Sequence, residues 1–572
     1  MQLRQSRLHR GVNEMVACGT GRSPREVALR QDGTDTRRLH PMRGDWLFIT
    51  AVVTAAVGAF AFVYHGFLTE DSISYGVGII DLADRGIGRL SAVFNGELSF
   101  GYYLLQWALI HIFNSVDRVS TWLNMTSALS CVATIAVFYI FVRRLFDRQV
   151  AFFASILLIF APSFWQLSHY GHPTLPAIAL FLGSLVVLDH MLAPSVADRW
   201  VAGEHTGEKS GVARESAEGI RSHWLPKVIA FVLLAAGALT MRADVLLLWG
   251  VYFGLLVYRQ GNRRQVALLV GLCFLSLVVY AVLRAAFLGY LVSPSGGSVA
   301  HHIRDRLNGS QLGHNALKNL SLWGFGANIF IILSALVTAG FLFAKRRYRL
   351  LLLALAWILP LAVFLPFRAM DFSRISALSL PMLVLLATLL PTVLPVHRRV
   401  VAFVGLLVAS QLVAILTYPL VVRIYPFETV YQGRYIAAVP LGFDVADSLV
   451  KQRFLTARDQ IAQRVVQTKD RDVLIMGSSD TMPYYYFLRI QRGPLDEHLE
   501  VLHGVPVHRI RTPENTFYLY DADNCPECTG VVKAFLQDDR AWPLLVHIVP
   551  FNTGSEPAGL FLSDVELKAL TR

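Results

Sequence analysis

The chain has 572 residues, of which 54% are hydrophobic and 16% are charged, and its formal net charge at neutral pH is +12. This charge does not indicate nucleic-acid binding, because Lys and Arg cluster in short segments between long apolar runs, as the positive-inside rule requires. The repeated apolar runs indicate a polytopic α-helical membrane protein. Five Cys residues are too few to predict a disulfide-stabilised fold.

The chain begins with a basic segment at 1–45 that has no long apolar run, so we predict a disordered cytoplasmic tail. The region 46–421 follows, and we expect it to contain eleven transmembrane helices and the catalytic site. The predicted spans lie at about 46–67, 119–142, 149–167, 173–192, 224–241, 244–258, 265–290, 319–344, 349–367, 375–395 and 400–421.

The basic loops set the orientation of these spans. They alternate correctly only if the N-terminus is inside and the apolar segment 100–113 does not cross the membrane. We therefore expect residues 68–118 to form a large outer loop, with 100–113 as an interfacial helix. The expected location is the inner (plasma) membrane, with a cytoplasmic N-terminus and an extracytoplasmic C-terminus.

Residues 422–572 contain no further span and are expected to form an extracytoplasmic α/β domain. The runs at 472–479 and 544–549 are typical of buried strands. Cys525 and Cys528 form a Cys-x-x-Cys pair in a compartment where thiols can oxidise. No thioredoxin-like residues flank the pair, so a local structural pair is favoured over a redox motif.

The predicted topology gathers ionisable side chains on the outer face. Glu70 and Asp71 directly follow the first span, and later outer turns supply His169, His172, Arg242, Asp244, Arg368 and Arg374. A carboxylate can act as a general base toward a hydroxyl group, and Arg binds phosphate with bidentate geometry. Carboxylate and imidazole can instead hold a divalent metal ion.

Each of these residues also has a structural interpretation. Arginines anchor helix ends at lipid headgroups. His172, which precedes a proline, can cap the entry of a helix, and Arg242 can pair with Asp244 across a tight turn. Glu70 and Asp71 can simply stop a helix at the headgroups.

Several motifs resemble the GT-C class of integral-membrane glycosyltransferases, which includes protein O-mannosyltransferases and the aminoarabinose transferases of lipid A. An acidic motif at 69–72 follows the first span, and an outer-loop segment ends in the aromatic run 100–105. Further similarities are the arginine-rich span end at 142–147, the Pro-Thr-Leu-Pro motif at 173–176 and the outer turn at 366–381. The resemblance covers about residues 45–395.

The resemblance implies a polyprenyl-phosphate-linked sugar donor and an acidic base in the first outer loop, which is Asp71 here, with Glu70 second. Many members of the class have an acidic residue in the second outer turn, where this chain has His169 and His172, so metal use stays open. We expect a sugar to pass to a hydroxyl group of a glycan, lipid or protein. His172, His169, Arg242, Asp244, Arg368 and Arg374 are expected to bind substrate.

Two other classes of function are compatible with such a chain. A transporter or flippase tends to carry polar residues at mid-membrane and broken helices, whereas the predicted spans 375–395 and 400–421 are almost free of charge. A non-catalytic envelope assembly protein would tolerate changes around Asp71.

Overall fold

The computed structural model describes residues 70–93, 96–168, 171–192, 224–290, 320, 323–324, 326–364 and 372–424. In the C-terminal region it describes 462–463, 466–467, 473–477, 482–493, 495–502, 505–521 and 544–547. All of these residues belong to one compact unit, Ala55–Arg572. The predicted tail at 1–45 and the first predicted span at 46–67 lie outside the described residues.

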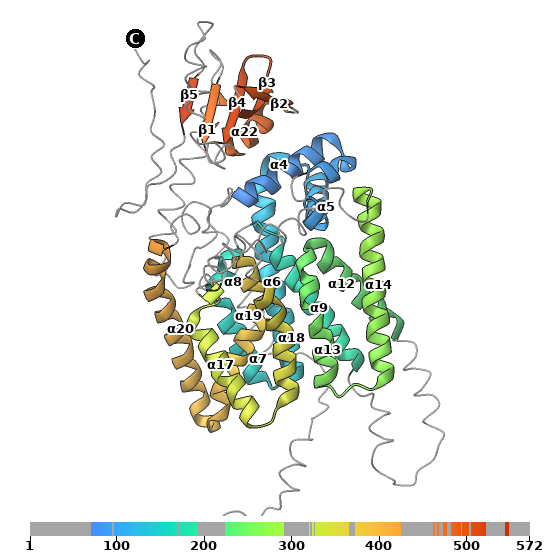
Figure 1. Ribbon diagram of the computed structural model, residues 1–572, viewed down its shortest axis with the longest axis vertical. Coiled ribbons are helices and arrows are strands. Elements are labelled where there is room, and N and C mark those ends of the chain that lie inside the picture. Colours follow the sequence, from blue (N-terminus) through green and yellow to red (C-terminus); the bar gives the residue numbers. More distant parts are fainter. Residues whose placement is uncertain are drawn as a thin grey trace, which may run out of the picture. The chain divides into compact units, whose positions relative to one another are not determined.

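Two helices occupy the segment that was predicted as the first outer loop. Helix α4 (Glu70–Arg85) leads through the 3-10 helix η1 (Ile87–Ala92) to helix α5 (Gly96–Phe113), as Figure 1 shows. Gly86, with φ of 84°, makes the turn between α4 and η1, a conformation that glycine adopts at little cost. Helix α5 contains the helix predicted at 100–113 and kinks at Ser99, whose backbone is not helical.

Five described helices are long and apolar enough to cross a membrane: α6 (Val119–Leu145), α9 (Thr174–Leu192), α12 (Trp224–Met241), α14 (Arg263–Leu288) and α20 (Val396–Ile424). Shorter apolar helices are α7 (Arg148–Ile159), α13 (Gly250–Tyr258), α17 (Ile329–Ala344), α18 (Tyr348–Phe364) and α19 (Phe372–Leu389). Apart from 46–67, every predicted span therefore falls on an apolar helix.

Several predicted spans are shorter or more interrupted than expected. The segment 149–167 divides into α7 and α8 (Pro162–Leu167), because Pro162 has no N–H with which to continue the first helix. The segment 244–258 begins as the 3-10 helix η3 (Ala243–Leu248) before α13. In the segment 319–344, α17 begins only at Ile329, where the side chain of Asn328 accepts a hydrogen bond from the backbone N–H of Phe330.

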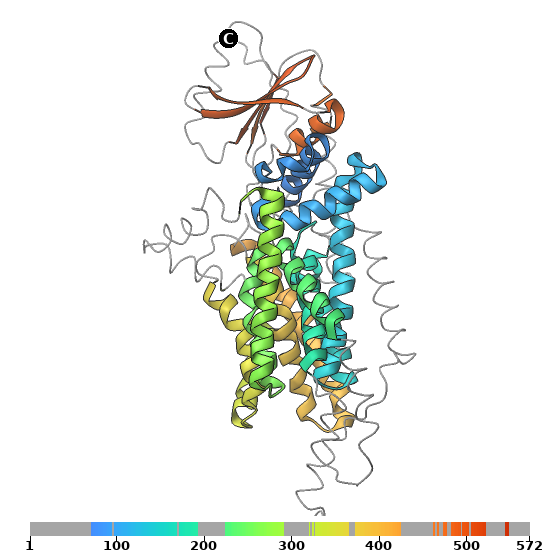
Figure 2. The ribbon, with the colours of Figure 1, turned by 90° about the vertical axis from the view of Figure 1, so that its right-hand side faces the viewer.

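Helix α9 is the centre of the helical region and packs against α6 and α12, while α12 also packs against α5 and α14 (Figures 1 and 2). The core around it is aromatic: the ring of Phe181 lies 5.4 Å from that of Tyr252 and 5.6 Å from that of Trp357. Large apolar side chains are exposed on the outer helices, as expected of a surface that faces lipid; examples are Phe274, Val282, Leu336, Val401 and Leu416.

The described part of 422–572 contains a five-stranded sheet in the order β2-β3-β4-β1-β5. Its strands are β1 (Val473–Gly477), β2 (Asp496–Leu502), β3 (Val505–Arg511), β4 (Thr516–Asp521) and β5 (Leu544–His547). Strand β1 is parallel to both of its neighbours, β4 and β5. Strand β3 is antiparallel to both of its neighbours, β2 and β4. Strands β1 and β5 confirm the two strands expected at 472–479 and 544–549.

Candidate functional site

The start of α4 lies against the turn that precedes α9. Gly171 in this turn has φ of 58°, and a Cβ atom placed on it would lie 3.0 Å from Cβ of Leu123, 3.1 Å from Oδ1 of Asn124 and 3.5 Å from Cβ of Ser72. Only glycine satisfies both the backbone conformation and the limited space. Because Ser72 directly follows Asp71, the backbone at the start of α4 lies close to the turn that precedes α9.

His172 is held in this turn by three hydrogen bonds. Its backbone N–H donates to Oγ of Ser127 at 3.0 Å, and its Nδ1 accepts from the backbone N–H of Thr174 at 3.2 Å. Nδ1 also lies 2.8 Å from Oγ1 of Thr174. Since Nδ1 accepts from the backbone, the proton of the neutral ring is assigned to Nε2. The side chain therefore caps the entry to α9, which is the structural interpretation that the sequence allowed.

Arg242 reaches the same residues from the end of α12. Its Nη1 donates to Oγ1 of Thr174 at 3.0 Å, and its Nη2 forms an ion pair with the carboxylate of Asp244. The side chains of Arg242 and Asp244 are only 5% and 8% exposed. We call His172, Thr174, Arg242 and Asp244 the outer network. Within it the charge of Arg242 is balanced by Asp244, so the pairing that the sequence suggested as an alternative is observed.

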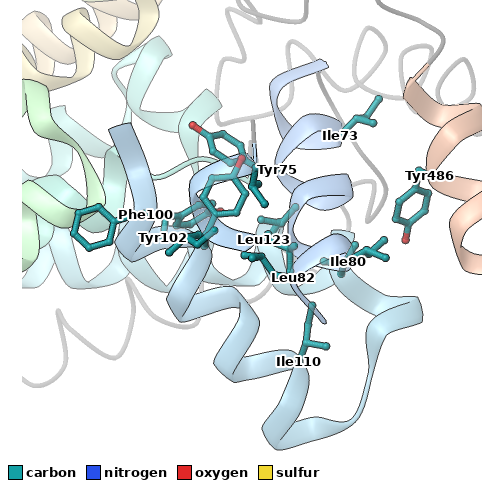
Figure 3. Close-up of a cluster of buried hydrophobic side chains, with 14 of the residues drawn as sticks. Ile73, Tyr75, Ile80, Leu82, Phe100, Tyr102, Ile110, Leu123 and Tyr486 are labelled. Carbon is teal, nitrogen blue, oxygen red and sulfur yellow. The ribbon is translucent and has the colours of Figure 1, made fainter. Parts of the chain in front are cut away.

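A group of tyrosines connects α4 and α5 to this network. The ring of Tyr75 lies edge-on to His172 at 5.6 Å, and 5.4 Å from the rings of both Tyr102 and Tyr103. Figure 3 shows Tyr75 on α4 facing Tyr102 on α5. Burial raises the pKa of Tyr102 and of Tyr103 well above the ordinary 10.0, so both phenols stay protonated. The sequence pointed to Tyr102 and Tyr103 only as part of an aromatic run.

The remaining predicted site residues are described incompletely or not at all. Glu70 and Asp71 are the first two residues of α4, but their side chains lie outside the described residues. Arg374 is in the first turn of α19, and its side chain also lies outside the described residues. His169 and Arg368 are not among the described residues. The structure thus brings together the start of α4, His172, Arg242 and Asp244, and leaves the placement of the others as a prediction.

No group of three His, Cys, Asp or Glu side chains that could hold a metal ion occurs among the described residues. The carboxylates of Glu70 and Asp71 and the imidazole of His169 lie outside that set. Cys525 and Cys528 are also outside it, whereas Cys131 and Cys273 are buried and unbridged, as expected of packing residues.

A second buried ion cluster marks the opposite ends of the same helices. The carboxylate of Asp189 is fully buried and accepts hydrogen bonds of 2.6 Å from Nε of Arg144 and 2.6 Å from Nε of Arg259. Nη2 of Arg259 also donates to the carbonyl of Arg144 at 3.0 Å. This inner cluster joins the C-terminal ends of α6, α9 and α13, which the predicted topology places on one side of the membrane.

Helix α9 links the two clusters, since Thr174 is its first residue and Asp189 lies in its last turn. The helix has 19 residues and is therefore about 28 Å long, close to the thickness of a bilayer's hydrocarbon core. The outer network and the inner cluster thus lie at the two ends of one helix that is long and apolar enough to span a membrane.

Comparison with known proteins finds a family model that matches part of the chain. A family model described as the N-terminal part of oligosaccharyl transferase STT3 matches residues 98–198, which cover α6, α9 and all of α5 except its first two residues, and which include His172 and Thr174. The resemblance to GT-C class membrane glycosyltransferases is thereby confirmed for this part of the chain. No curated protein sequence matches the chain significantly.

Solved structures show a limited likeness. The structure of ArnT from Cupriavidus metallidurans bound to undecaprenyl phosphate is 16% identical, with a TM-score of 0.46, over 78% of this chain and 85% of that one. The Archaeoglobus fulgidus oligosaccharyltransferase tethered with an acceptor peptide is 12% identical, with a TM-score of 0.42, over 77% of this chain and 62% of that one. Another structure of the Archaeoglobus fulgidus enzyme, a complex with Zn and sulfate, is 14% identical, with a TM-score of 0.34, over 77% of this chain and 61% of that one.

Proposed function

We propose that this chain is a membrane glycosyltransferase that moves a sugar from a polyprenyl-phosphate donor to a hydroxyl acceptor at the outer face of the membrane. The proposal includes eleven spans, an inside N-terminus and an extracytoplasmic C-terminal α/β domain. The observation that carries it is the junction of the acidic start of α4 with the turn at His172. That turn lies within the segment matched by the oligosaccharyl transferase family model.

The position of the buried charges supports chemistry at the surface over passage through the membrane. Among the described residues, the buried Asp and Arg side chains are Asp189, Arg242, Asp244 and Arg489. Asp189 lies in the last turn of α9, Arg242 and Asp244 lie between α12 and α13, and Arg489 lies beyond the spans. A transport pathway usually places such groups near the bilayer midplane.

In the proposed reaction Asp71 accepts the proton of the acceptor hydroxyl while the hydroxyl oxygen attacks the anomeric carbon. The bond between that carbon and the donor phosphate oxygen breaks, and polyprenyl phosphate leaves as an anion. We assign the binding of this phosphate to Arg368 and Arg374, because Arg242 is already paired with Asp244. Glu70 and His169 are the residues that would hold a divalent metal ion, which would add positive charge at the phosphate.

The outer network then has a supporting role. Arg242 fixes Thr174, Thr174 fixes the ring of His172, and the turn that carries His172 holds the start of α4. The Nε2 atom of His172 is the donor in the assigned tautomer and is suited to bind an oxygen of the acceptor or of the donor phosphate. A rigid support of this kind is what a general base needs to meet a hydroxyl at hydrogen-bond distance.

The proposal is tested with membranes from cells that produce the chain. Radiolabelled mannose, glucose and arabinose linked to undecaprenyl phosphate serve as donor probes, and label that leaves the lipid is measured. We expect release from at least one donor, and none in membranes with an equal amount of the Glu70→Gln, Asp71→Asn double variant. Asp117→Asn is the matched control, since Asp117 is an exposed carboxylate that pairs with the exposed Arg118. Equal release by the double variant and the original chain would contradict the proposal.

A further inference from the structure

Helix α22 (Met482–Arg492), from the region beyond the membrane helices, packs directly against α4. Tyr486 belongs to the same buried cluster as Ile73 and Ile80 of α4, and Figure 3 shows its ring on the side of α22 that faces them. Ile73 is two residues from Asp71. The buried cluster that Tyr486 joins therefore includes a residue of α4 close to the acidic motif.

An ion cluster fixes the other end of α4 to the same helix. Nη2 of Arg489 lies 3.0 Å from Oδ1 of Asp81 and 3.1 Å from Oδ2 of Asp84, and the Arg489 side chain is fully buried. Nε of Arg85 lies 3.1 Å from Oδ1 of Asp81, and its Nη2 donates to the carbonyl of Leu495 at 3.4 Å. Two arginines and two aspartates thus form a cluster with no net charge.

Helix α22 presents its other side to the sheet. Leu488 is buried with Val473 of β1, Ile510 of β3 and Phe517 of β4. Tyr486 and Arg489, three residues apart, instead share the face that meets α4. Residues on one short helix therefore connect the sheet to α4, and a movement of the sheet would be transmitted to α4.

We propose that Arg489 is a positioning residue for sugar transfer: it holds α4 in place so that the carboxylates at the start of that helix meet the substrate. This inference rests on the proposed function, because it assigns the base to Glu70 or Asp71. The region after the membrane helices is then part of the catalytic unit. Arg489 itself touches no reacting atom in this account.

The geometry also predicts which substitutions are tolerated. A single nitrogen of Arg489 makes both ion pairs, so the planar fork of the guanidinium is not used. A Lys ammonium is a point charge and can replace one such nitrogen. Met at this position keeps the apolar stem but leaves Asp81 and Asp84 facing each other without Arg489. Removing one partner of a buried ion pair is strongly destabilising for the contact.

The test compares Arg489→Met with Arg492→Met in the full-length protein in detergent. Arg492 is on the same helix but pairs with Glu514 at 2.8 Å, and among the described side chains it makes no ion pair with α4. Hydrogen exchange is measured by mass spectrometry on peptides from 70–85 and, as a control for folding, on peptides from α9. We expect Arg489→Met to speed exchange in 70–85 by at least about tenfold with α9 unchanged, because a local contact is lost. Arg492→Met and Arg489→Lys should resemble the original chain.

Transfer is measured in parallel with the undecaprenyl-phosphate donor that the original chain uses. A misplaced base lowers kcat more than it raises KM, so we expect Arg489→Met to lower kcat by about ten- to a hundredfold. The KM for the donor should change by less than about threefold, and Lys should restore kcat. If Arg489→Met disturbs α9 as well, Asp81→Asn is the second variant: it removes one of the two carboxylates that pair with Arg489 while Arg489 keeps its ion pair with Asp84, and it should speed exchange only in 70–85.

Unchanged exchange in 70–85 for both Arg489→Met and Asp81→Asn would overturn the inference. So would full activity of a folded Arg489→Met protein. If that variant were fully active while Asp71→Asn was inactive, the inference would fail and the proposed function would stand. If Asp71→Asn and Glu70→Gln were both active, the proposed base would fail whatever Arg489 does.

Discussion

Arg242 and Thr174 are 68 residues apart in the sequence, yet Nη1 of Arg242 donates a hydrogen bond of 3.0 Å to the hydroxyl of Thr174. This bond connects the end of α12 to the first residue of α9. Through the contact of Thr174 with His172 it reaches the turn on which the acidic start of α4 lies.

Arg242→Lys should be harmful although the charge is kept. Arg242 uses two nitrogens, one toward Thr174 and one toward Asp244, and an ammonium group cannot reproduce that planar geometry. The loss of one charge-assisted hydrogen bond should cost about 1.5–3 kcal/mol in the free energy of unfolding. Thermal unfolding in detergent measures this, with the exposed Arg118→Lys as the control. Equal melting temperatures for Arg242→Lys and the original chain would contradict the role of the network.

Gly171→Ala should displace the turn that holds α4. The backbone at Gly171 is left-handed, and a Cβ atom there would meet Leu123 and Asn124 at 3.0 and 3.1 Å. We expect a loss of at least about 1–2 kcal/mol in stability from the backbone conformation alone, and lower transfer activity. Gly271→Ala in α14 is the matched control: a Cβ atom there meets nothing within 4 Å, so helix propensity should make it neutral or stabilising. A stable, fully active Gly171→Ala protein would show that the turn does not position α4.

Asp189→Asn should weaken the membrane region without altering the chemistry. The substitution leaves Arg144 and Arg259, whose side chains are 13% and 25% exposed, without their shared carboxylate. Loss of one partner of a buried ion pair costs about 3–5 kcal/mol, and the partial exposure of both arginines points to the lower end of that range. Thermal unfolding should show a clear fall in melting temperature, while the activity of the protein that stays folded should be unchanged. A fall in kcat at low temperature, where the variant is folded, would contradict the separation of the two clusters.

The pH dependence of stability should show that the pKa of Asp84 is raised in the folded chain. Burial raises its pKa above the ordinary 3.8; Arg489 opposes this shift, Asp81 adds to it, and Arg85 opposes it. The folded chain therefore binds this proton at a higher pH than the unfolded chain. The contribution of Asp84 to stability consequently grows as pH falls through its folded pKa and is complete below 3.8. As pH falls from 7 toward 4, the melting temperature of the original chain should rise relative to that of Asp84→Asn. A constant difference, or one that moves the other way, would contradict the raised pKa.

Much of the helical region could be predicted from hydropathy, because a bilayer requires long uninterrupted apolar helices. The helices α6, α9, α12 and α14 begin and end within a few residues of the predicted positions. The late start of α17 could not be foreseen, because it depends on the backbone of Asn328, which has φ of 69°.

The candidate site was predictable only where its members are close in sequence or marked by charge. Arg242 and Asp244 are two residues apart, so their pairing could be stated as an alternative. Thr174 was noted only as part of the motif at 173–176, because the sequence does not show that Arg242 of another helix binds its hydroxyl. Arg489 was missed because its partner Asp81 is 408 positions away and neither residue belongs to a recognisable motif.

The central claim, that Asp71 is the base of a sugar transfer, is tested most directly by the rate of transfer in Asp71→Asn compared with Glu70→Gln. Both variants keep the size of the side chain and remove a carboxylate that can accept a proton. The account predicts that Asp71→Asn inserts and folds normally but loses about two to four orders of magnitude in transfer, while Glu70→Gln retains more activity. An active, folded Asp71→Asn protein beside an inactive Glu70→Gln protein would assign the base to Glu70, and normal transfer by both would contradict a catalytic role for this stretch.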